Sequence, residues 1–100
     1  MQVEKMYETA ETVSELMKAL SSRNRLLILC QLVQEELSVG ELASRLDMRE
    51  PAMSQQLAVL RRDGLVSRRR DGQVVYYTLA RPDIRQLMEF LYETFCAPNE

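Results

Sequence analysis

The segment that most constrains the fold is "LVSRRRDGQVVYYTL", which covers residues 65–79. Asp71-Gly72 is a strong signal for a two-residue turn, and the β-branched and aromatic residues around it favour two antiparallel strands. A type I′ turn at these two residues sets the pairing of the arginines: Arg70 with Gln73, Arg69 with Val74 and Arg68 with Val75. The sequence therefore predicts a β-hairpin with three arginines crowded at its tip.

A short helix with a well-marked start lies ahead of this hairpin. Ser38 and Glu41 have the S-x-x-E spacing of a capping box. Leu37 and Leu42 supply the hydrophobic staple that packs around such a box. This pattern predicts a helix over about residues 39–46.

The next helix follows a turn at residues 47–50 and runs over roughly residues 52–63. Pro51 occupies a position that the first turn of a helix tolerates, and Gly64 is a typical C-terminal glycine. Helical spacing predicts that its buried residues are Met53, Leu57 and Leu60. Two short helices joined by a tight turn are typical of a helix-turn-helix motif, and a basic hairpin directly after that motif is a wing.

Three further helices complete the prediction, each marked by apolar residues at helical spacing. The Ser21-Ser22 pair ends the first helix and caps the second, and Pro82 opens the last. The apolar positions are Met6, Ala10, Val13, Met17 and Leu20 in the first, Leu26, Leu29, Cys30, Val33 and Leu37 in the second, and Ile84, Leu87, Met88, Leu91 and Phe95 in the last. The expected order is α-α-α-α-β-β-α, a mainly α fold of the winged helix-turn-helix type.

A chain of 100 residues is expected to form one winged-helix DNA-binding domain over residues 1–100, with a thin core. Its predicted parts are dimerisation helices at residues 1–20 and 82–97, the helix-turn-helix at residues 38–63 and the wing at residues 65–79. The terminal helices carry more apolar surface than one winged helix needs, which favours a homodimer through them. The alternative is that these stripes close the core of a monomer.

The charges are sorted along the chain, although the net charge is only −2. Residues 38–81 carry eight arginines against five acidic residues, a net charge of +3, between ends of −2 and −3. Arginine outnumbers lysine eleven to two, which favours forked contacts with phosphate or guanine. A basic middle between acidic ends suggests a polyanion-binding face, and its alternative is an ordinary solvated surface.

Double-stranded DNA is the polyanion that this order of motifs predicts. The exposed start of the helix over residues 52–63 should reach base edges, since glutamine pairs with adenine and serine with base or phosphate; the residues are Ala52, Ser54, Gln55 and Gln56. Backbone contacts are expected from Arg45, Arg49, Arg61 and Arg62, and contacts in a narrow, AT-rich minor groove from Arg68, Arg69 and Arg70. Glu50 costs affinity near phosphate unless it accepts from a cytosine amino group. A dimer implies a palindromic operator.

With these motifs in view, the chain resembles the ArsR/SmtB family of dimeric winged-helix repressors over about residues 12–97. The motifs that carry the resemblance are "LLILCQLV", "LSVGEL", "SQQLAVLRRDGLV" and "LYETFC". Within the family the chain looks most like the HlyU, BigR and SqrR group, which lacks metal sites and responds to reactive sulfur species or oxidants. The resemblance implies a repressor that binds its operator as a homodimer.

Departures from the metal-sensing members of the family argue against a metal site. Those members typically carry cysteines in a pattern like "ELCVCDL", where this chain has Ser38 and Gly40, and others bind zinc through histidine, which this chain lacks. Two cysteines and scattered carboxylates do not make a tetrahedral soft-metal site within one subunit, so we expect no metal and no cofactor. Arg49, Glu50 and Pro51 replace the serine or glutamine frequent at that turn, which leaves the operator sequence open.

Cys30 and Cys96, the only cysteines, lie 66 positions apart. From the residues alone, a cysteine on an apolar helical stripe is usually a packing residue, and the negative end of a helix disfavours a thiolate at Cys96. The resemblance implies the opposite, because similar proteins link a cysteine of the second helix to one of the last helix, directly or through inserted sulfur atoms. The hypothesis is a repressor that leaves DNA when reactive sulfur species or oxidants cross-link Cys30 and Cys96.

Two other functions stay open: a constitutive regulator or anti-silencer with structural cysteines, and a protein-interaction module whose wing meets an acidic partner. An enzyme is not expected, since the sequence has no histidine, no glycine-rich phosphate loop and no recognisable nucleophile with its base. The longest apolar run, residues 26–30, is far too short for a membrane span. The acidic N-terminal segment lacks an apolar signal core, which predicts a cytoplasmic protein without a membrane partner.

Overall fold

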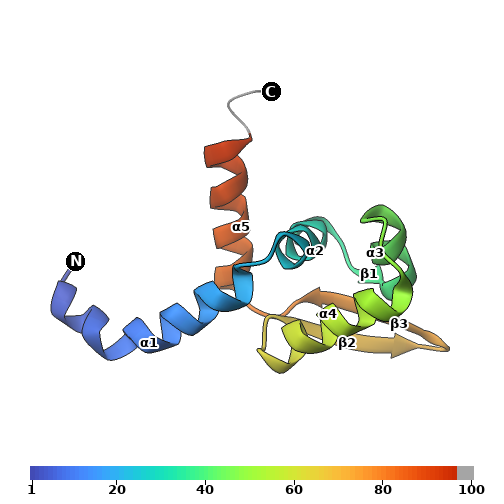
Figure 1. Ribbon diagram of the computed structural model, residues 1–100, viewed down its shortest axis with the longest axis horizontal. Coiled ribbons are helices and arrows are strands. Elements are labelled where there is room, and N and C mark those ends of the chain that lie inside the picture. Colours follow the sequence, from blue (N-terminus) through green and yellow to red (C-terminus); the bar gives the residue numbers. More distant parts are fainter. Residues whose placement is uncertain (97–100) are drawn as a thin grey trace.

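The computed structural model describes residues 1–96, which form five helices and three strands. Their order is α1 (Val3–Leu20), α2 (Arg23–Gln34), β1 (Leu37–Ser38), α3 (Val39–Arg45), α4 (Glu50–Arg62), β2 (Val66–Asp71), β3 (Val74–Leu79) and α5 (Pro82–Phe95) (Figure 1). The predicted mainly helical winged helix-turn-helix is confirmed, with α3 and α4 as the motif and β2 and β3 as the wing. Residue 97, the expected end of the last helix, lies outside the described residues.

Local capping explains where the helices begin and end. The Ser22 side chain accepts a hydrogen bond from the Arg25 N–H at 3.3 Å and starts α2. Both halves of the predicted capping box of α3 form: the Glu41 N–H donates to Ser38 Oγ at 3.1 Å, and the Ser38 N–H donates to Glu41 Oε1 at 3.0 Å. Gly64 follows α4 with a φ of 78°, which its missing Cβ allows.

Helix α4 begins two residues before the predicted start. Arg49 is its N-cap residue with extended backbone, so Glu50 already belongs to the first turn. Pro51 fits there because the first N–H groups of a helix have no intrahelical acceptor, and a proline costs nothing at such a position. The predicted turn at residues 47–50 is therefore one residue shorter, and Asp47 holds its bend with a φ of 53°.

The sheet contains one strand that the sequence prediction missed. Strand β1 is only two residues long and pairs antiparallel with β3, so the order across the sheet is β1-β3-β2. So short a strand has no alternating pattern of its own and forms because the residues just before α3 meet the edge of β3. The expected order α-α-α-α-β-β-α is thus corrected by one added strand after α2.

The predicted register of the hairpin is wrong by two residues. Asp71 pairs with Val74, so the loop is Gly72-Gln73 and not Asp71-Gly72. Gly72, the first loop residue, takes a positive φ of 65°, whereas a type I′ turn at Asp71-Gly72 needs a positive φ at Asp71 as well. A shift of two residues keeps every side chain on its predicted face.

The core lies where α2, α3, α4 and α5 meet the sheet. Met53, Leu57 and Leu60 of α4 are fully buried, as predicted. In α2 the predicted stripe is partly wrong, because the buried residues are Ile28, Leu29 and Leu32, whereas Cys30 is exposed. Leu37 is buried in β1, beyond the end of α2.

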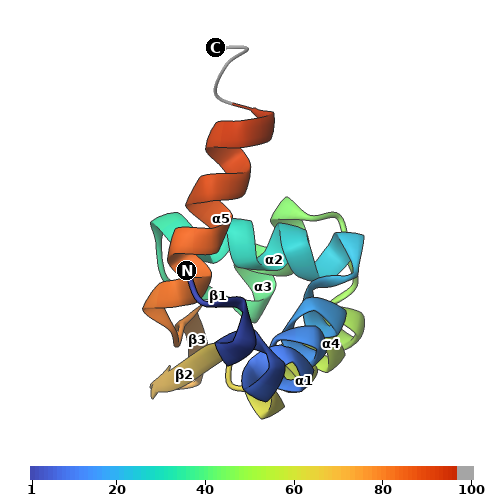
Figure 2. The same cartoon turned by 90° about the vertical axis from the view of Figure 1, so that its left-hand side faces the viewer.

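Helices α1 and α5 project away from the rest of the molecule (Figure 1), and the perpendicular view shows the projection of α5 again (Figure 2). The radius of gyration is therefore 14.9 Å, above the value of about 13 Å expected for a compact domain of this length. Within residues 1–96, no helix combines the length and apolar character needed to cross a membrane.

Candidate nucleic-acid interface and thiol groove

Helix α4 presents a polar face opposite its buried one. Ala52, Ser54 and Gln55 are exposed at its start, as expected of residues that would reach base edges. Gln56 lies on the flank next to Leu57 and is only half-exposed, and its Oε1 atom is buried without a hydrogen-bond partner among residues 1–96. The structure thus leaves Ser54 and Gln55 freer than Gln56 to meet a ligand.

A groove of about 490 Å³ runs between α4 and the wing. Four residues of the predicted DNA-contacting set line it together: Ser54, Arg61, Arg62 and Arg68. Its floor is apolar, formed by Val39, Ala58, Val75 and Tyr77. Three guanidinium groups beside a serine hydroxyl make this groove electropositive, and such a surface suits the phosphate backbone of nucleic acid.

The three wing arginines do not share one face. Side chains alternate along a strand, so Arg68 and Arg70 point to the same side of β2 and Arg69 to the other. Arg68 pairs with the buried Tyr77 and faces α4. Arg69 pairs with Tyr76 and lies on the opposite face, where its guanidinium binds Glu36. Only two of the three arginines therefore point to the side of the α4 groove.

Two more predicted residues have partners within the protein. Arg45 donates from Nη1 to Gln31 Oε1 at 3.2 Å and from Nη2 to Glu35 Oε1 at 3.0 Å, which directs it toward α2. The Glu50 carboxylate lies beside Gly40, in the first turn of α3. Carboxylates are favoured at helix N-termini, so Glu50 stabilises the starts of α3 and α4. Arg49 is exposed ahead of α4.

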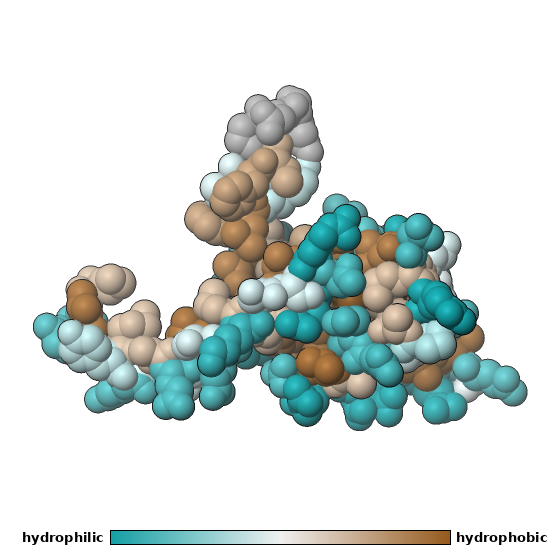
Figure 3. Space-filling model, viewed as in Figure 1, coloured by the Kyte–Doolittle hydropathy of each residue, from teal (hydrophilic) through white to brown (hydrophobic). Residues whose placement is uncertain are grey.

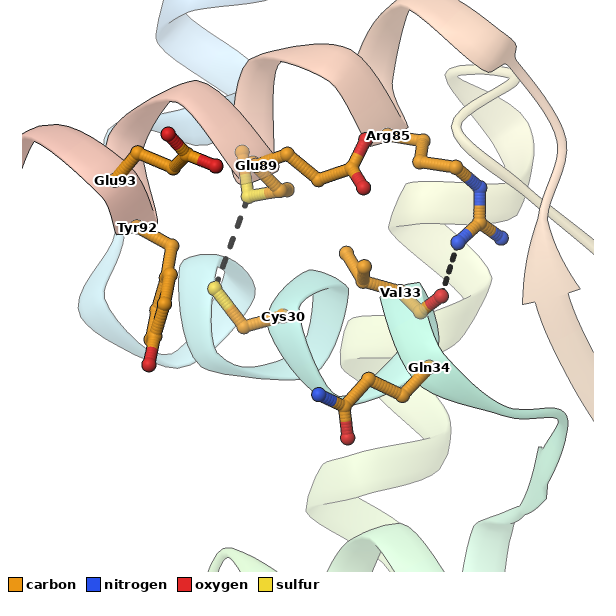
Figure 4. A pocket seen from close by; sticks show the side chains of 8 residues that line it. Cys30, Val33, Gln34, Arg85, Glu89, Tyr92 and Glu93 are labelled. Carbon is orange, nitrogen blue, oxygen red and sulfur yellow. Dashed lines mark hydrogen bonds between the residues drawn. The ribbon is translucent and has the colours of Figure 1, made fainter. Parts of the chain in front are cut away.

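A second groove, of about 440 Å³, separates α2 from α5 and contains Cys30 (Figure 4). The α2 side carries Cys30, Val33 and Gln34, and the α5 side carries Arg85, Met88, Glu89, Tyr92 and Glu93. The Cys30 sulfur points across the groove and lies 3.8 Å from Met88 Sδ. Arg85 closes one end by donating to the Val33 carbonyl. The groove is deep enough to expose a thiol to a small reagent while holding it against α5.

The environment of Cys30 disfavours its thiolate. Its residue surface is exposed, but the sulfur itself faces α5, and this partial burial is the larger cause of a raised pKa for the Cys30 thiol. Negative charge on Cys96 is the second cause and also raises that pKa. Both causes act in the same direction, against the charged form of Cys30.

Cys96 ends α5 on the same face as the groove. Its N–H donates to the Tyr92 carbonyl at 2.7 Å, which continues the helical path by one residue. Met88, Tyr92 and Cys96 are spaced by four residues, so they follow one another along a single face of the helix. Cys96 is a free, exposed thiol and lies one turn beyond the residues that line the groove. Within residues 1–96, no three histidine, cysteine or acidic side chains gather into a metal-binding cluster.

Apolar side chains are exposed along the projecting helices α1 and α5. Figure 3 shows this surface in brown on α5 and at the far end of α1. Helix α1 exposes Val3, Met6, Tyr7, Val13 and Met17, and α5 exposes Phe90, Tyr92 and Phe95. Of the predicted stripes of α1 and α5, only Leu20, Ile84 and Met88 are buried within the chain. Such a surface is typical of an interface.

Sequence reasoning missed the residues that connect these sites. Glu35, Glu36 and Gln31 bind predicted DNA-contacting arginines, and Arg85 and Tyr92 shape the thiol groove. Only Tyr92 had a sequence signal, its spacing of four residues from both Met88 and Cys96. The others depend on contacts between residues far apart in the chain.

Comparisons with known proteins agree with this geometry. The model of the "Bacterial regulatory protein, arsR family" matches residues 22–68, from α2 into the wing. Transcriptional activator HlyU of Vibrio cholerae serotype O1 is 43% identical over 100 residues, which cover 100% of this chain and 93% of HlyU. The crystal structure of the transcriptional repressor BigR from Xylella fastidiosa has a TM-score of 0.90 and 42% identity, covering 97% of this chain and 99% of that one.

A second similar structure is that of a homodimer. The solution structure of the homodimeric winged helix-turn-helix DNA-binding domain of Mb0332 from Mycobacterium bovis has a TM-score of 0.79 and 31% identity, covering 93% of this chain and 86% of that one. Full-length similarity to HlyU and BigR at more than 40% identity leaves no doubt about the relationship. The chain belongs to the arsR family of bacterial regulatory proteins and is a DNA-binding transcriptional regulator, not an enzyme.

Proposed function

We propose that the chain is a homodimeric repressor that leaves its operator when Cys30 and Cys96 become linked. The observation that carries this proposal is the position of Cys30, whose sulfur lies in an open groove between α2 and α5 and faces the helix that Cys96 ends. HlyU is named an activator and BigR a repressor. We favour repression because a repressor that the inducer releases from DNA allows the genes that respond to that inducer to be transcribed.

Operator binding would use α4 and the wing of each protomer. Ser54 and Gln55 would read base edges in the major groove, with Ala52 and Gln56 beside them. Arg61, Arg62 and Arg68 would contact phosphates from the groove between α4 and the wing. Arg49 and Arg70, both exposed, would add further backbone contacts. Wing arginines favour a narrow minor groove, which is typical of AT-rich DNA. A palindromic operator follows from two such protomers related by a two-fold axis.

Dimerisation would cover the apolar faces of α1 and α5. These helices project from the domain and expose Met6, Met17 and Phe95, among others, to solvent in a single chain. A two-fold interface places the same surfaces of both copies against each other, which removes this apolar area from water. The similar Mb0332 domain is described as homodimeric, which supports the same arrangement here.

The chemical step begins at either thiol and ends with a bridge. The Cys30 thiolate attacks the sulfane sulfur of a persulfide, forming Cys30–S–S–H and releasing the other sulfur as a thiolate that takes the electron pair. The Cys96 thiolate then attacks Cys30 Sγ, the inner sulfur of this persulfide, and expels the outer sulfur as hydrosulfide, which leaves a Cys30–Cys96 disulfide. The two protein thiols lose two electrons, and the sulfane sulfur gains them. Attack on a longer captured chain leaves a sulfur atom within the bridge, and a peroxide gives the disulfide with water as the reduced product.

A bridge would change the relation between α2 and α5. Closing a loop of this length removes chain freedom worth on the order of 4 kcal/mol from the unfolded state in the chain-entropy model. Cys30 must also leave its contact with Met88 to reach Cys96, one turn beyond the groove. Because α5 joins the proposed dimer interface and α2 supports α3 and the sheet, their shift would alter the spacing of the two reading heads. A coupling of roughly 1–3 kcal/mol is enough to release a repressor.

The test combines intact-mass analysis with DNA binding. The wild-type protein, Cys30→Ser and Cys96→Ser are treated with sodium tetrasulfide or with peroxide, and their affinity is measured for a duplex selected by the reduced protein from a randomised pool. We expect the intact mass of the wild type alone to show the loss of two hydrogens, with or without added sulfur atoms, that a bridge between the two cysteines produces. We also expect the affinity for the duplex to fall in the wild type alone. Wild-type binding that is indifferent to the bridge would indicate a constitutive regulator or anti-silencer. Absence of salt-dependent duplex binding would indicate a protein-interaction module.

A further inference from the structure

The wing is tied across the sheet by one arginine. Arg69 of β2 donates from Nε and Nη2 to the two carboxylate oxygens of Glu36, at 2.8 and 2.6 Å, and Glu36 directly precedes β1. Between them, the Arg69 guanidinium lies over the Tyr76 ring of β3, 4.9 Å from its centroid. Glu36, Tyr76 and Arg69 therefore connect the β1 edge, the central strand and the β2 edge on one face.

This face is the one that turns away from α4. The paired oxygens of Glu36 satisfy the forked guanidinium and raise the pKa of Arg69 further above its ordinary range. The Glu36 carboxylate thus occupies the Nε and Nη2 edge of the guanidinium, the edge that a phosphate would otherwise bind in the forked mode. Arg68, on the other face, lines the α4 groove, and no ion pair within residues 1–96 engages its guanidinium.

A second ion pair joins α3 to the same end of α2. Arg45, in the last turn of α3, donates to Glu35 Oε1 and Gln31 Oε1. Glu35 is the C-cap residue of α2, next to Glu36 in the chain. Two neighbouring carboxylates at the end of α2 thus hold two elements of the DNA-reading head, α3 and the wing.

The same end of α2 is held to α5. The Val33 carbonyl accepts from Arg85, and Cys30, one turn earlier, contacts Met88. Residues 30–36, the end of α2 and the two residues after it, therefore contact α5 on one side and α3 with β2 on the other. A displacement of this segment therefore moves Arg45 of α3 and Arg69 of the wing, which bind Glu35 and Glu36.

We propose that Arg45 and Arg69 are positioning residues, which fix α3 and the wing to Glu35 and Glu36, and that they do not neutralise phosphates. A displacement of α2 at the thiol groove would then move the DNA-reading head, which consists of α3, α4 and the wing. This second part of the proposal rests on the proposed function. Exposed ion pairs contribute little to global stability, but forked geometry and the aromatic contact set the orientation of the wing.

The positioning role is tested with Glu36→Gln, Arg69→Gln, the double variant and Arg68→Gln as the matched control. DNA affinity is measured against salt concentration with the selected duplex. Both single variants should weaken binding by a similar factor, roughly two- to fivefold, and the double variant should be no worse than either. The slope of log affinity against log salt should stay at its wild-type value in Arg69→Gln and become shallower, by roughly one per lost contact, in Arg68→Gln.

The sign of the Glu36→Gln effect decides the question. Removing a carboxylate that merely competes with phosphate would tighten DNA binding, whereas removing a positioning partner weakens it. Tighter binding by Glu36→Gln, or a shallower salt slope in Arg69→Gln, would overturn the assignment. The midpoint of thermal unfolding is measured for each variant. A midpoint near that of the wild type shows that the fold is intact and that the loss of affinity comes from a displaced wing.

The coupling role uses the ratio of affinities before and after tetrasulfide treatment. If treatment releases the wild type from DNA and changes the ratio by the same factor in the variant that carries both Arg45→Gln and Arg69→Gln, the coupling is refuted and the proposed function stays intact. A wild-type protein that forms the bridge and keeps its affinity would refute the proposed function instead. We expect the double variant to form the bridge normally, as intact mass reports, and to lose most of its response.

Discussion

Cys30 of α2 and Met88 of α5 are in contact across a groove, with their sulfur atoms 3.8 Å apart. Met88 is buried, whereas Cys30 keeps an exposed surface. Tyr92 and Cys96 continue from Met88 along the same face of α5 at intervals of four residues. The face of α5 that Cys30 contacts therefore leads, two turns further on, to the second thiol.

The pH dependence of Cys30 alkylation should show a raised pKa. Burial first and charge on Cys96 second raise the pKa of this thiol. Because the thiolate is the reactive form, the rate should rise with pH and reach half its maximum above the range of an ordinary exposed cysteine. In Cys96→Ser the midpoint should move down but stay above that range, since burial remains. Iodoacetamide incorporation, read at the Cys30 peptide, measures both; identical midpoints in the two proteins would contradict the charge interaction.

Gln55→Ala should relax sequence preference without changing the salt slope. Gln55 is exposed at the start of α4, and if it pairs with one base as proposed, the loss of that contact costs roughly 1–3 kcal/mol for the preferred base only. Arg61→Gln should instead weaken preferred and mutated duplexes alike. Binding to a set of single-base variants of the selected duplex compares the two, and uniform loss in both proteins would show that Gln55 is not a reading residue.

Met17→Glu should dissociate the dimer. Met17 lies on the exposed apolar seam of α1, and a buried carboxylate at a two-fold interface would appear once in each copy. Lys18→Glu introduces the same group on the neighbouring, polar side of that helix and should leave the dimer intact. Sedimentation at several concentrations, with DNA affinity measured in parallel, is the readout. Equal behaviour of the two variants would mean that this seam is not the interface.

Ser38→Ala should lower the free energy of unfolding by about 1 kcal/mol, the usual cost of a lost N-cap side chain. Ser38 Oγ accepts from the Glu41 N–H at the start of α3, and no neighbouring side chain takes its place. Ser44→Ala, on the exposed face of the same helix, serves as the control and should change stability little. Urea denaturation measures the free energy of unfolding of the wild type and both variants, and equal dependences of that free energy on urea concentration make the three values comparable.

The other half of this capping box should respond to pH. Hydrogen bonds from the Ser38 backbone, and then from its side chain, lower the pKa of Glu41 below the ordinary value of 4.5. Such a carboxyl stabilises the fold above its unfolded-state pKa, and the contribution is lost as the pH falls through the folded-state value. The stability difference between the wild type and Glu41→Gln should therefore be fully present at neutral pH and shrink in acid. A difference that does not change with pH would contradict this.

Helix boundaries were predictable because their signals are local. Ser22, Ser38 and Gly64 mark ends through their own side chains or backbone, and the structure confirms all three. The register of the wing was not predictable from Asp71-Gly72 alone, because two adjacent two-residue loops both contain the glycine. The strand β1 was missed for a related reason, since its two residues form a strand only against β3.

The candidate site divides in the same way. The exposed polar start of α4 follows from the burial of Met53 and Leu57, which helical spacing fixes. Strand alternation places Arg68 and Arg69 on opposite faces of β2, and this could be predicted from the sequence. Glu36, which binds Arg69, lies 33 positions away in the chain, on the other edge of the sheet. A carboxylate at that distance has no local pattern that points to it.

The sequence by itself determined the elements of this protein, because capping, turn formation and the spacing of apolar residues act over a few positions of the chain. Only the tertiary structure decided that Cys30 faces α5 instead of the core, that its environment includes Cys96, and that Glu35 and Glu36 hold the reading head. These relations join residues from different elements, and their energies exist only once the chain has closed the long loops between them.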